Sequence, residues 1–278
     1  MSVAVRAAVA LLACCLAVAL AWQVGRHGAG ALASGTVWAG VTLLSLSAFG
    51  AVRSAVRLWR GLGANRAIAR EVRQRRVAPA VAGRAVGEAA ARAGLDRHRV
   101  HVVDSAAPFA FTYGLLRPRV AVSHGIAAAA SPRELEAILT HEHAHVRGRD
   151  PLRSLVADVS AARTAGLPLL GHLRSVFAAD RELAADRHAV TRSGTRAVAG
   201  ALLKVVDTPT WAAAAPASAM GSRTLLEARI AQLETGEPPP APPARWRVAA
   251  SAAGAAAYAW ALAGSAMLVA ATPLACTG

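Results

Sequence analysis

The sequence is short of acidic residues, cysteines and aromatic residues. Only 17% of its 278 residues are charged and 4% are aromatic, whereas 55% are hydrophobic. An ordinary soluble domain carries about a quarter charged residues. This balance argues against a disordered chain and against a typical cytosolic domain, and it indicates membrane segments. The three cysteines, Cys14, Cys15 and Cys276, match no CxxC metal-binding spacing and cannot frame a fold with disulfides.

The shortage of acids leaves a large positive charge. The chain has 16 acidic and 31 basic residues, for a net charge of +15, and Lys204 is its only lysine. A charge of one sign and this size suits an anionic partner, either lipid headgroups or nucleic acid. Nucleic acid is the less favoured partner, because the arginine cluster Arg53–Arg76 has only Trp59 as an aromatic neighbour for base stacking.

Three stretches contain no Asp, Glu, Lys or Arg, and they predict the layout of the chain. They are Ala7–Gly25, Gly28–Val52 and Val248–Gly278, and each is about long enough for a spanning helix. The first could instead be a cleaved signal peptide, but the close spacing of the first two favours a helical hairpin. We expect a transmembrane hairpin over residues 1–58, a second domain over 59–246, and a C-terminal transmembrane helix with a short tail over 247–278.

The distribution of arginines predicts the orientation of these segments. Arg53–Arg76 holds eight arginines and Arg245 and Arg247 precede the last apolar stretch, whereas the link between the first two stretches holds only Arg26. By the positive-inside rule, the middle domain is cytoplasmic and the C-terminal tail is outside, in a multi-pass protein of the cell membrane. The cluster Arg53–Arg76 is then expected to lie along anionic lipid headgroups.

The middle domain reads as mainly α-helical with a small β-sheet. Residues 62–97 are rich in Ala and Arg and predict helices. Short β-branched or aromatic runs at Val100–Val103, Phe109–Tyr113 and Val120–Ser123 predict strands, and the Gly- and Pro-containing link between the last two predicts a hairpin. Ser131-Pro132-Arg133-Glu134 then has the pattern of a helix start with a capping box.

The helix that starts there carries an HExxH motif at His141–His145. Its two histidines are four residues apart, so both rings leave the same face and can bind one Zn²⁺. Glu142 emerges beside that face and can act as a general base on a metal-bound water. His143 points away from His145 and is not expected to be a ligand.

A catalytic zinc site usually has a third protein ligand. The metzincin pattern is excluded, because Pro151 stands where its third histidine would be. Glu182 and Asp186 lie one turn apart on a later predicted helix, so Glu182 is the favoured third ligand and Asp186 can hold the ring N–H of a liganding histidine. His172 and His188 are competing third ligands. One zinc ion per chain is expected.

Three pieces of the sequence resemble membrane-bound zinc peptidases of the BlaR/MecR antirepressor type, and nearly as much the HtpX-like and CAAX-prenyl zinc proteases. These pieces are Pro108–Val120, Glu134–Asp150 and the ExxxD element Glu182–Asp186. The resemblance implies a gluzincin-like peptidase fold with zinc on His141, His145 and Glu182, and Glu142 as base. It also implies an edge strand that pairs with substrate backbone, formed by the four residues Ala110, Phe111, Thr112 and Tyr113.

The sequence differs from the antirepressor sensors in one feature and from the HtpX-like enzymes in another. Antirepressor sensors carry an extracellular penicillin-binding domain, for which no sequence follows here. HtpX-like enzymes usually place two membrane helices between HExxH and the third ligand, whereas Leu155–Ala179 has no long apolar run. We therefore expect a sensorless antirepressor-like endopeptidase acting on cytoplasmic or membrane-associated proteins, such as a transcriptional repressor. The alternatives are an HtpX-like quality-control protease, a site-2 protease, disfavoured by the charges after HExxH, and a non-enzymatic basic anchor for nucleic acid.

Overall fold

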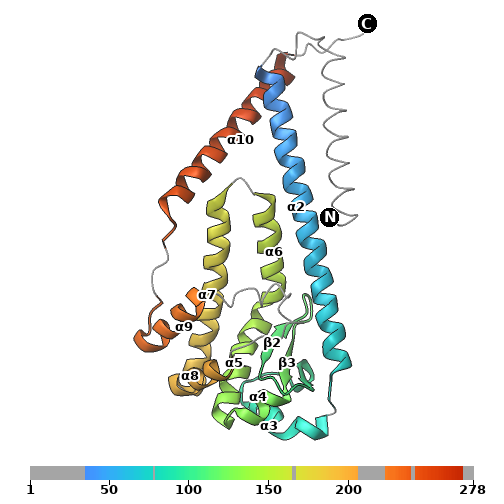
Figure 1. The fold of residues 1–278 in the computed structure, drawn as a ribbon, viewed down its shortest axis with the longest axis vertical. Helices are drawn as coiled ribbons and strands as arrows, with labels where there is room; N and C mark the ends of the chain where they lie inside the picture. Colours follow the sequence, from blue (N-terminus) through green and yellow to red (C-terminus); the bar gives the residue numbers. More distant parts are fainter. Residues whose placement is uncertain (1–34, 78, 165–166, 206–222, 239–241, 272–278) are drawn as a thin grey trace. The chain divides into compact units, whose positions relative to one another are not determined.

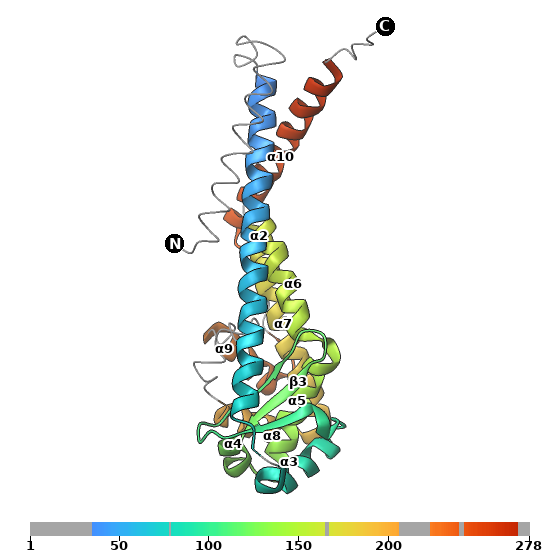
Figure 2. The same cartoon turned by 90° about the vertical axis from the view of Figure 1, so that its right-hand side faces the viewer.

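The computed structural model describes residues 35–77, 79–164, 167–205, 223–238 and 242–271 (Figures 1 and 2). These residues are mostly helical and contain one three-stranded sheet. The elements in chain order are α2 (Gly35–Gln74), α3 (Pro79–Arg92), the 3₁₀ helix η2 (Arg97–Arg99), β1 (Val100–Val103), β2 (Ala110–Tyr113), β3 (Arg119–Ser123), α4 (His124–Ala129), α5 (Pro132–Gly148), α6 (Asp150–Arg163), α7 (Pro168–Ser193), α8 (Thr195–Lys204), α9 (Arg223–Thr235) and α10 (Arg245–Ala271).

The chain divides into two compact units. One unit comprises Met1–Leu58, Val159–Leu173 and Pro242–Gly278, and the other comprises Trp59–Asp158 and Arg174–Ala241. Nothing in the sequence led us to expect Val159–Leu173 in the first unit. All of the strands and the HExxH motif lie in the second unit.

The sheet has the strand order β1-β3-β2. β2 pairs antiparallel with β3, with Ala110 opposite Val122 and Thr112 opposite Val120, which confirms the predicted hairpin. β1 pairs parallel with β3, so the last strand in sequence is the central one. Among the described residues, this order leaves β2 at an edge of the sheet, as the resemblance implies, whereas its pairing with substrate stays a prediction.

Both faces of the sheet are covered within the second unit (Figure 1). One face carries Val100, Val102, Val120 and Val122 and packs with buried residues of α3, α5 and α8. The other face packs against Ile68 and Val72 of α2 through Val103, Phe109, Tyr113 and Ala121. Because strand side chains alternate between faces, Ala110 and Thr112 face α5 whereas Phe111 and Tyr113 face the other way.

α5 begins where the sequence predicts. The Ser131 hydroxyl accepts a hydrogen bond from the Glu134 N–H, and the Glu134 carboxylate accepts one from the Ser131 N–H at 2.7 Å, which completes the capping box. Leu135, Leu139 and Val146 are buried against the sheet side of the core. This packing fixes the rotation of the helix, and with it the direction in which the HExxH residues point.

The first unit contains the apolar stretches. Within the described residues, one helix is long and apolar enough to cross a membrane, namely α2 over Gly40–Gln74, and only 6% of its most apolar window is buried. The predicted helix at Ala7–Gly25 and the tail after Ala271 lie outside the described residues. The predicted number of spans therefore stays a prediction.

Hydrogen bonds join the three parts of the first unit. The Ser54 hydroxyl donates to the Val159 carbonyl at 3.0 Å, and the Leu169 N–H donates to the Ser251 hydroxyl at 2.9 Å. α2 and α6 approach closely here, since a Cβ at Gly50 would stand 2.4 Å from the Arg163 carbonyl oxygen. The end of α6 and the start of α7 thus pack with the apolar helices.

Candidate metal centre

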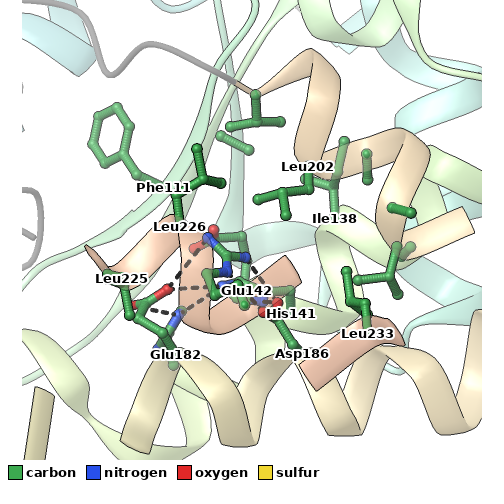
Figure 3. A pocket seen from close by; sticks show the side chains of 18 of the residues that line it. Phe111, Ile138, His141, Glu142, Glu182, Asp186, Leu202, Leu225, Leu226 and Leu233 are labelled. Atoms are coloured by element: carbon green, nitrogen blue, oxygen red, sulfur yellow. Dashed lines mark hydrogen bonds and ion pairs between the residues drawn. The ribbon is translucent and has the colours of Figure 1, made fainter. Parts of the chain in front are cut away.

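Three side chains of α5 and α7 converge, and Figure 3 labels two of them, His141 and Glu182. The third is His145, whose Nε2 atom lies 3.0 Å from that of His141. Glu182 of α7 places Oε2 at 3.4 Å from His141 Nε2 and Oε1 at 3.5 Å from His145 Nε2. Among the described residues, the ligand atoms of these three side chains lie close enough together to hold a metal ion.

A local turn orients His145. Its Nδ1–H donates to Asp150 Oδ2 at 2.6 Å, which leaves the Nε2 lone pair directed into the group. The turn depends on Arg149, whose φ of 51° is left-handed and ends α5. It also depends on Gly148, because a Cβ there would stand 2.6 Å from Asp150 Oδ1. The chain therefore folds back on its own helix to fix one of the two rings.

A tertiary contact orients His141. Its Nδ1–H donates to Asp186 Oδ1 at 2.9 Å, and Asp186 is fully buried. Arg229 of α9 holds the same carboxylate with two hydrogen bonds, from Nε to Oδ2 at 2.7 Å and from Nη2 to Oδ1 at 2.8 Å. Its Nη1 also lies 3.9 Å from Glu182 Oε2. One guanidinium thus neutralises part of the negative charge that α7 brings to the group.

The charges of these groups are strongly coupled. Burial lowers the pKa of His141, but the hydrogen bonds to Asp186 and Glu182 outweigh burial and raise it to about 10. Burial raises the pKa of Glu182, but the charge of His145 and the hydrogen bond to His141 bring it far below its ordinary value. A cation bound to the Nε2 atom of His141 would therefore compete with a proton for it.

Glu142 is held from the edge strand. The Thr112 hydroxyl lies 2.7 Å from Glu142 Oε2 and 3.2 Å from the Glu142 carbonyl oxygen. Both side chains are buried, with 5% and 7% of their residues' surface exposed. The predicted base therefore lies between the two histidines in sequence and against β2 in space.

The remaining predicted residues are divided between two environments. Ala110, Phe111 and Thr112 line the pocket over the histidines. Tyr113 is instead hydrogen-bonded to His101 and packs in the cluster on the α2 face of the sheet. His143 donates from Nδ1 to the Ala93 carbonyl at 2.9 Å. The two competing third ligands, His172 and His188, are not part of the group of three, and the His172 ring bonds to Arg247 within the first unit.

The pocket is large and mostly apolar. It has a volume of about 680 Å³ and lies entirely within the second unit. In Figure 3 the charged side chains His141, Glu142, Glu182 and Asp186 lie near its floor, and leucines and isoleucine surround them. Its apolar walls come mainly from α5, α8 and α9, and they include Ile138, Val198, Leu202, Leu225, Leu226, Ile230 and Leu233.

Sequence reasoning missed two residues of the centre. Asp150 had no predicted role at the site, although its position two residues after Gly148 is a signal for a turn back onto His145. Arg229 had no signal, because it stands 43 residues after Asp186 on a helix that no motif marks. Only the packing of α9 on α7 brings it to the site.

Comparison with known proteins gives a family for this chain. It is 41% identical over 86 residues to the protein "Protease HtpX homolog" from Ralstonia pickettii (strain 12J), covering 30% of each chain. It is 33% identical over 100 residues to the protein of the same name from Persephonella marina, covering 35% of this chain and 34% of the relative. The chain therefore matches about a third of the length of these curated relatives. No solved structure matches it significantly.

The family model described as "Peptidase family M48" matches residues 73–224, which is more than half of the chain. This range contains all three strands and the metal-ligand group, so the match covers the geometry described above. The chain therefore belongs to peptidase family M48, which confirms the predicted enzyme class, a metalloendopeptidase.

Proposed function

We propose that this protein is a membrane-bound, zinc-dependent endopeptidase. The observation that carries the proposal is the spacing of His141, His145 and Glu182, whose ligand atoms are 3.0, 3.4 and 3.5 Å apart. Ligand atoms that share one tetrahedral zinc ion at 2.0–2.1 Å lie about 3.3 Å from one another. Two neutral imidazoles and one carboxylate are also a common donor set for catalytic zinc. One zinc ion per chain fits this group.

The residues of the site divide the chemistry among them. Zinc, when bound, supplies Lewis acidity that activates water and polarises a peptide carbonyl. Glu142 takes a proton from the attacking water and passes it to the leaving amine. Asp150 and Asp186 hold the two histidine rings in the tautomer that ligates through Nε2. Arg229 keeps Asp186 and Glu182 in place.

The substrate of this site is an extended peptide. β2 is an edge strand whose residues Ala110–Thr112 line the pocket, so a substrate can add to it by strand pairing. The apolar walls favour hydrophobic side chains near the cleaved bond. Leu203, Leu226 and Ile230 of the wall are also 76%, 45% and 41% exposed, which extends the apolar surface beyond the pocket. Proteins that expose apolar segments are therefore the proposed substrates.

We propose the topology that the arginine distribution predicts. Residues 1–58 form a transmembrane hairpin, residues 59–246 form the cytoplasmic peptidase domain, and residues 247–278 cross the membrane again with the tail outside. Arg53–Arg76 lies along anionic lipid headgroups. In support, Arg53 and Arg57 lie in the first unit, which holds no acidic residue. Arg75, in the second unit, pairs with Glu71 at 2.6 Å.

Two subgroups remain candidates for the physiological role. A sensorless antirepressor-like protease would cut a transcriptional repressor, whereas an HtpX-like protease would degrade damaged membrane proteins. The packing of Val159–Leu173 with the apolar helices favours the HtpX-like role, because those residues lie between HExxH and Glu182. The names of the similar proteins favour it as well.

Zinc content together with proteolysis tests the proposed activity. The full-length protein in detergent is expected to bind one zinc ion and to cleave unfolded casein. Glu142→Gln should retain the zinc and lose at least about 100-fold in turnover. Glu136→Gln is the matched control, since Glu136 is on the same helix but pairs with Arg92 at 2.9 Å, away from the site. Full turnover by zinc-loaded Glu142→Gln would remove the proposal.

Cysteine labelling tests the topology. In a variant with Cys14 and Cys15 replaced, Cys276 should react with an impermeant maleimide added to whole cells. A cysteine placed at Ala213 should react only after the membrane is opened. The opposite pattern would place the peptidase domain outside and change the substrate class.

A further inference from the structure

One hydrogen bond connects the edge strand to the proposed general base. Thr112 is 5% exposed and its hydroxyl has Glu142 Oε2 at 2.7 Å as its nearer acceptor, with the Glu142 carbonyl at 3.2 Å. A hydroxyl has a single proton, so the shorter contact takes the hydrogen bond. The donor comes from β2 and the acceptor from α5, 30 residues later.

We propose that Thr112 is a positioning residue for catalysis, which holds the Glu142 carboxylate at the angle from which it accepts the proton of the attacking water. This inference rests on the proposed function, in which Glu142 is the base. With Oε2 engaged by Thr112, proton transfer falls to Oε1, for which the described residues provide no hydrogen-bond donor.

The geometry explains why the base needs this support. A glutamate side chain has three rotatable bonds, and its rotamers place the carboxylate at positions several ångströms apart. Misplacement of a reacting group by about 1 Å can cost about 100-fold in rate. Asp150 and Asp186 fix the two histidines in the same manner, so Thr112 gives the third functional side chain of α5 an equivalent partner.

The position of Thr112 also links the base to the substrate. The backbone of Thr112 belongs to the edge strand that the proposed substrate pairs with, and its side chain holds the base. Thr112 thus positions both the substrate and the base.

A purely structural role would be the burial of a satisfied hydroxyl, and substitutions separate the two roles. Thr112→Val keeps the shape and removes the donor, whereas Thr112→Ser keeps the donor. Thr140→Val is the matched control: Thr140 is fully buried on α5 beside His141, and its hydroxyl has no hydrogen-bond partner among the described residues.

Kinetics in the full-length zinc-loaded protein give the first readout. Thr112→Val should lower kcat by about 10- to 100-fold, with KM within about twofold of wild type and zinc content and unfolding temperature unchanged. Thr112→Ser should recover most of kcat, and Thr140→Val should match wild type. Wild-type kcat in Thr112→Val, or no recovery in Thr112→Ser, would overturn the inference.

Binding of a peptide hydroxamate gives a second readout that does not depend on turnover. If Thr112 acts through Glu142, Thr112→Val weakens hydroxamate binding in the wild-type background and has no effect in a Glu142→Ala background. Equal weakening in both backgrounds would show that Thr112 acts through the fold and not through the base.

The two proposals fail in distinguishable ways. Activity in zinc-loaded Glu142→Gln removes the proposed function, and the role of Thr112 with it. An inactive Glu142→Gln together with a fully active Thr112→Val removes only the role of Thr112.

Discussion

The candidate metal centre is built from two regions that differ in how the chain assembles them. The first is α5 with its C-terminal turn, where His141, His145 and Asp150 lie within ten residues of sequence. The second is the pair α7 and α9, where Arg229 bonds to Asp186, 43 residues earlier, and lies 3.9 Å from Glu182. Each region supplies a carboxylate that holds the Nδ1 of one histidine.

The difference shows which part of the centre is robust. In the first region, helix geometry and one turn bring the groups together, so they stay close even when the surrounding packing loosens. The second region depends on the docking of α9 on α7, which also involves the Gln232 amide donating to the Leu183 carbonyl at 2.9 Å. We therefore expect substitutions in the second region to damage the centre more.

The largest expected effect follows loss of the third ligand. Glu182→Ala removes the carboxylate that lies against both Nε2 atoms, and zinc affinity should fall by more than about 100-fold, since removal of an indirect partner alone costs 10–100-fold. Competition with a chelator measures the affinity. Glu182→His should retain part of the zinc. Wild-type affinity in Glu182→Ala would show that α7 supplies no ligand.

The two carboxylates that hold the histidines allow a direct test of the comparison. Asp150→Asn and Asp186→Asn should each lower zinc affinity by about 10- to 100-fold. Asp186→Asn should also lower the free energy of unfolding by about 3 kcal/mol, because it removes the charged partner of Arg229 in a buried ion pair. Chelator competition and chemical denaturation measure the two quantities. Equal destabilisation by both variants would contradict the difference between the regions.

A smaller effect is expected from the arginine of α9. Arg229→Gln removes two hydrogen bonds from Asp186 but leaves every proposed ligand in place, so zinc affinity should fall by about threefold to tenfold. The control is Arg187→Gln. Arg187 of α7 bonds at 2.7 Å to Gln232 of α9, the helix that carries Arg229, and it contacts no proposed ligand. If both variants lose zinc equally, Arg229 acts only by docking α9.

The smallest expected effect on the centre comes from His101, which lies in neither region. Burial, followed by the charges of Arg76 and Arg119, lowers the pKa of His101 to about 4. The unfolded chain, with a pKa near 6.5, then binds a proton that the folded chain does not between these two pH values. The contribution of His101 to the free energy of unfolding should therefore be fully present above pH 6.5. The free energy of unfolding should fall by up to about 3 kcal/mol as the pH drops to 4.

Denaturation of wild type and of His101→Gln at several pH values checks this prediction. Glutamine does not titrate and can keep a hydrogen bond with the Tyr113 hydroxyl, so the variant should lose less stability between pH 6.5 and 4. Its zinc affinity at pH 7 should equal that of wild type. Parallel stability curves for the two proteins would show that His101 is not the titrating group.

Much of the fold could be predicted because it rests on local patterns. The capping box at Ser131 and Glu134, the three short strands and the β2–β3 hairpin all appear in the structure where the sequence places them. Two features could not be predicted. The position of β3 between β1 and β2 depends on which strands pair. The packing of Val159–Leu173 with the apolar helices was not predictable, because this segment contains no long apolar run.

Helix periodicity made half of the centre predictable from the motif alone. Two histidines four residues apart must share a face of α5, and the glutamate between them must stand beside that face. The packing of separate elements was needed to place Glu182, and neither His172 nor His188, across the pair, and to bring Arg229 to Asp186 and Thr112 to Glu142. Backbone hydrogen bonds fix the rise and rotation along one helix, whereas distances between separate elements depend on how their side chains pack.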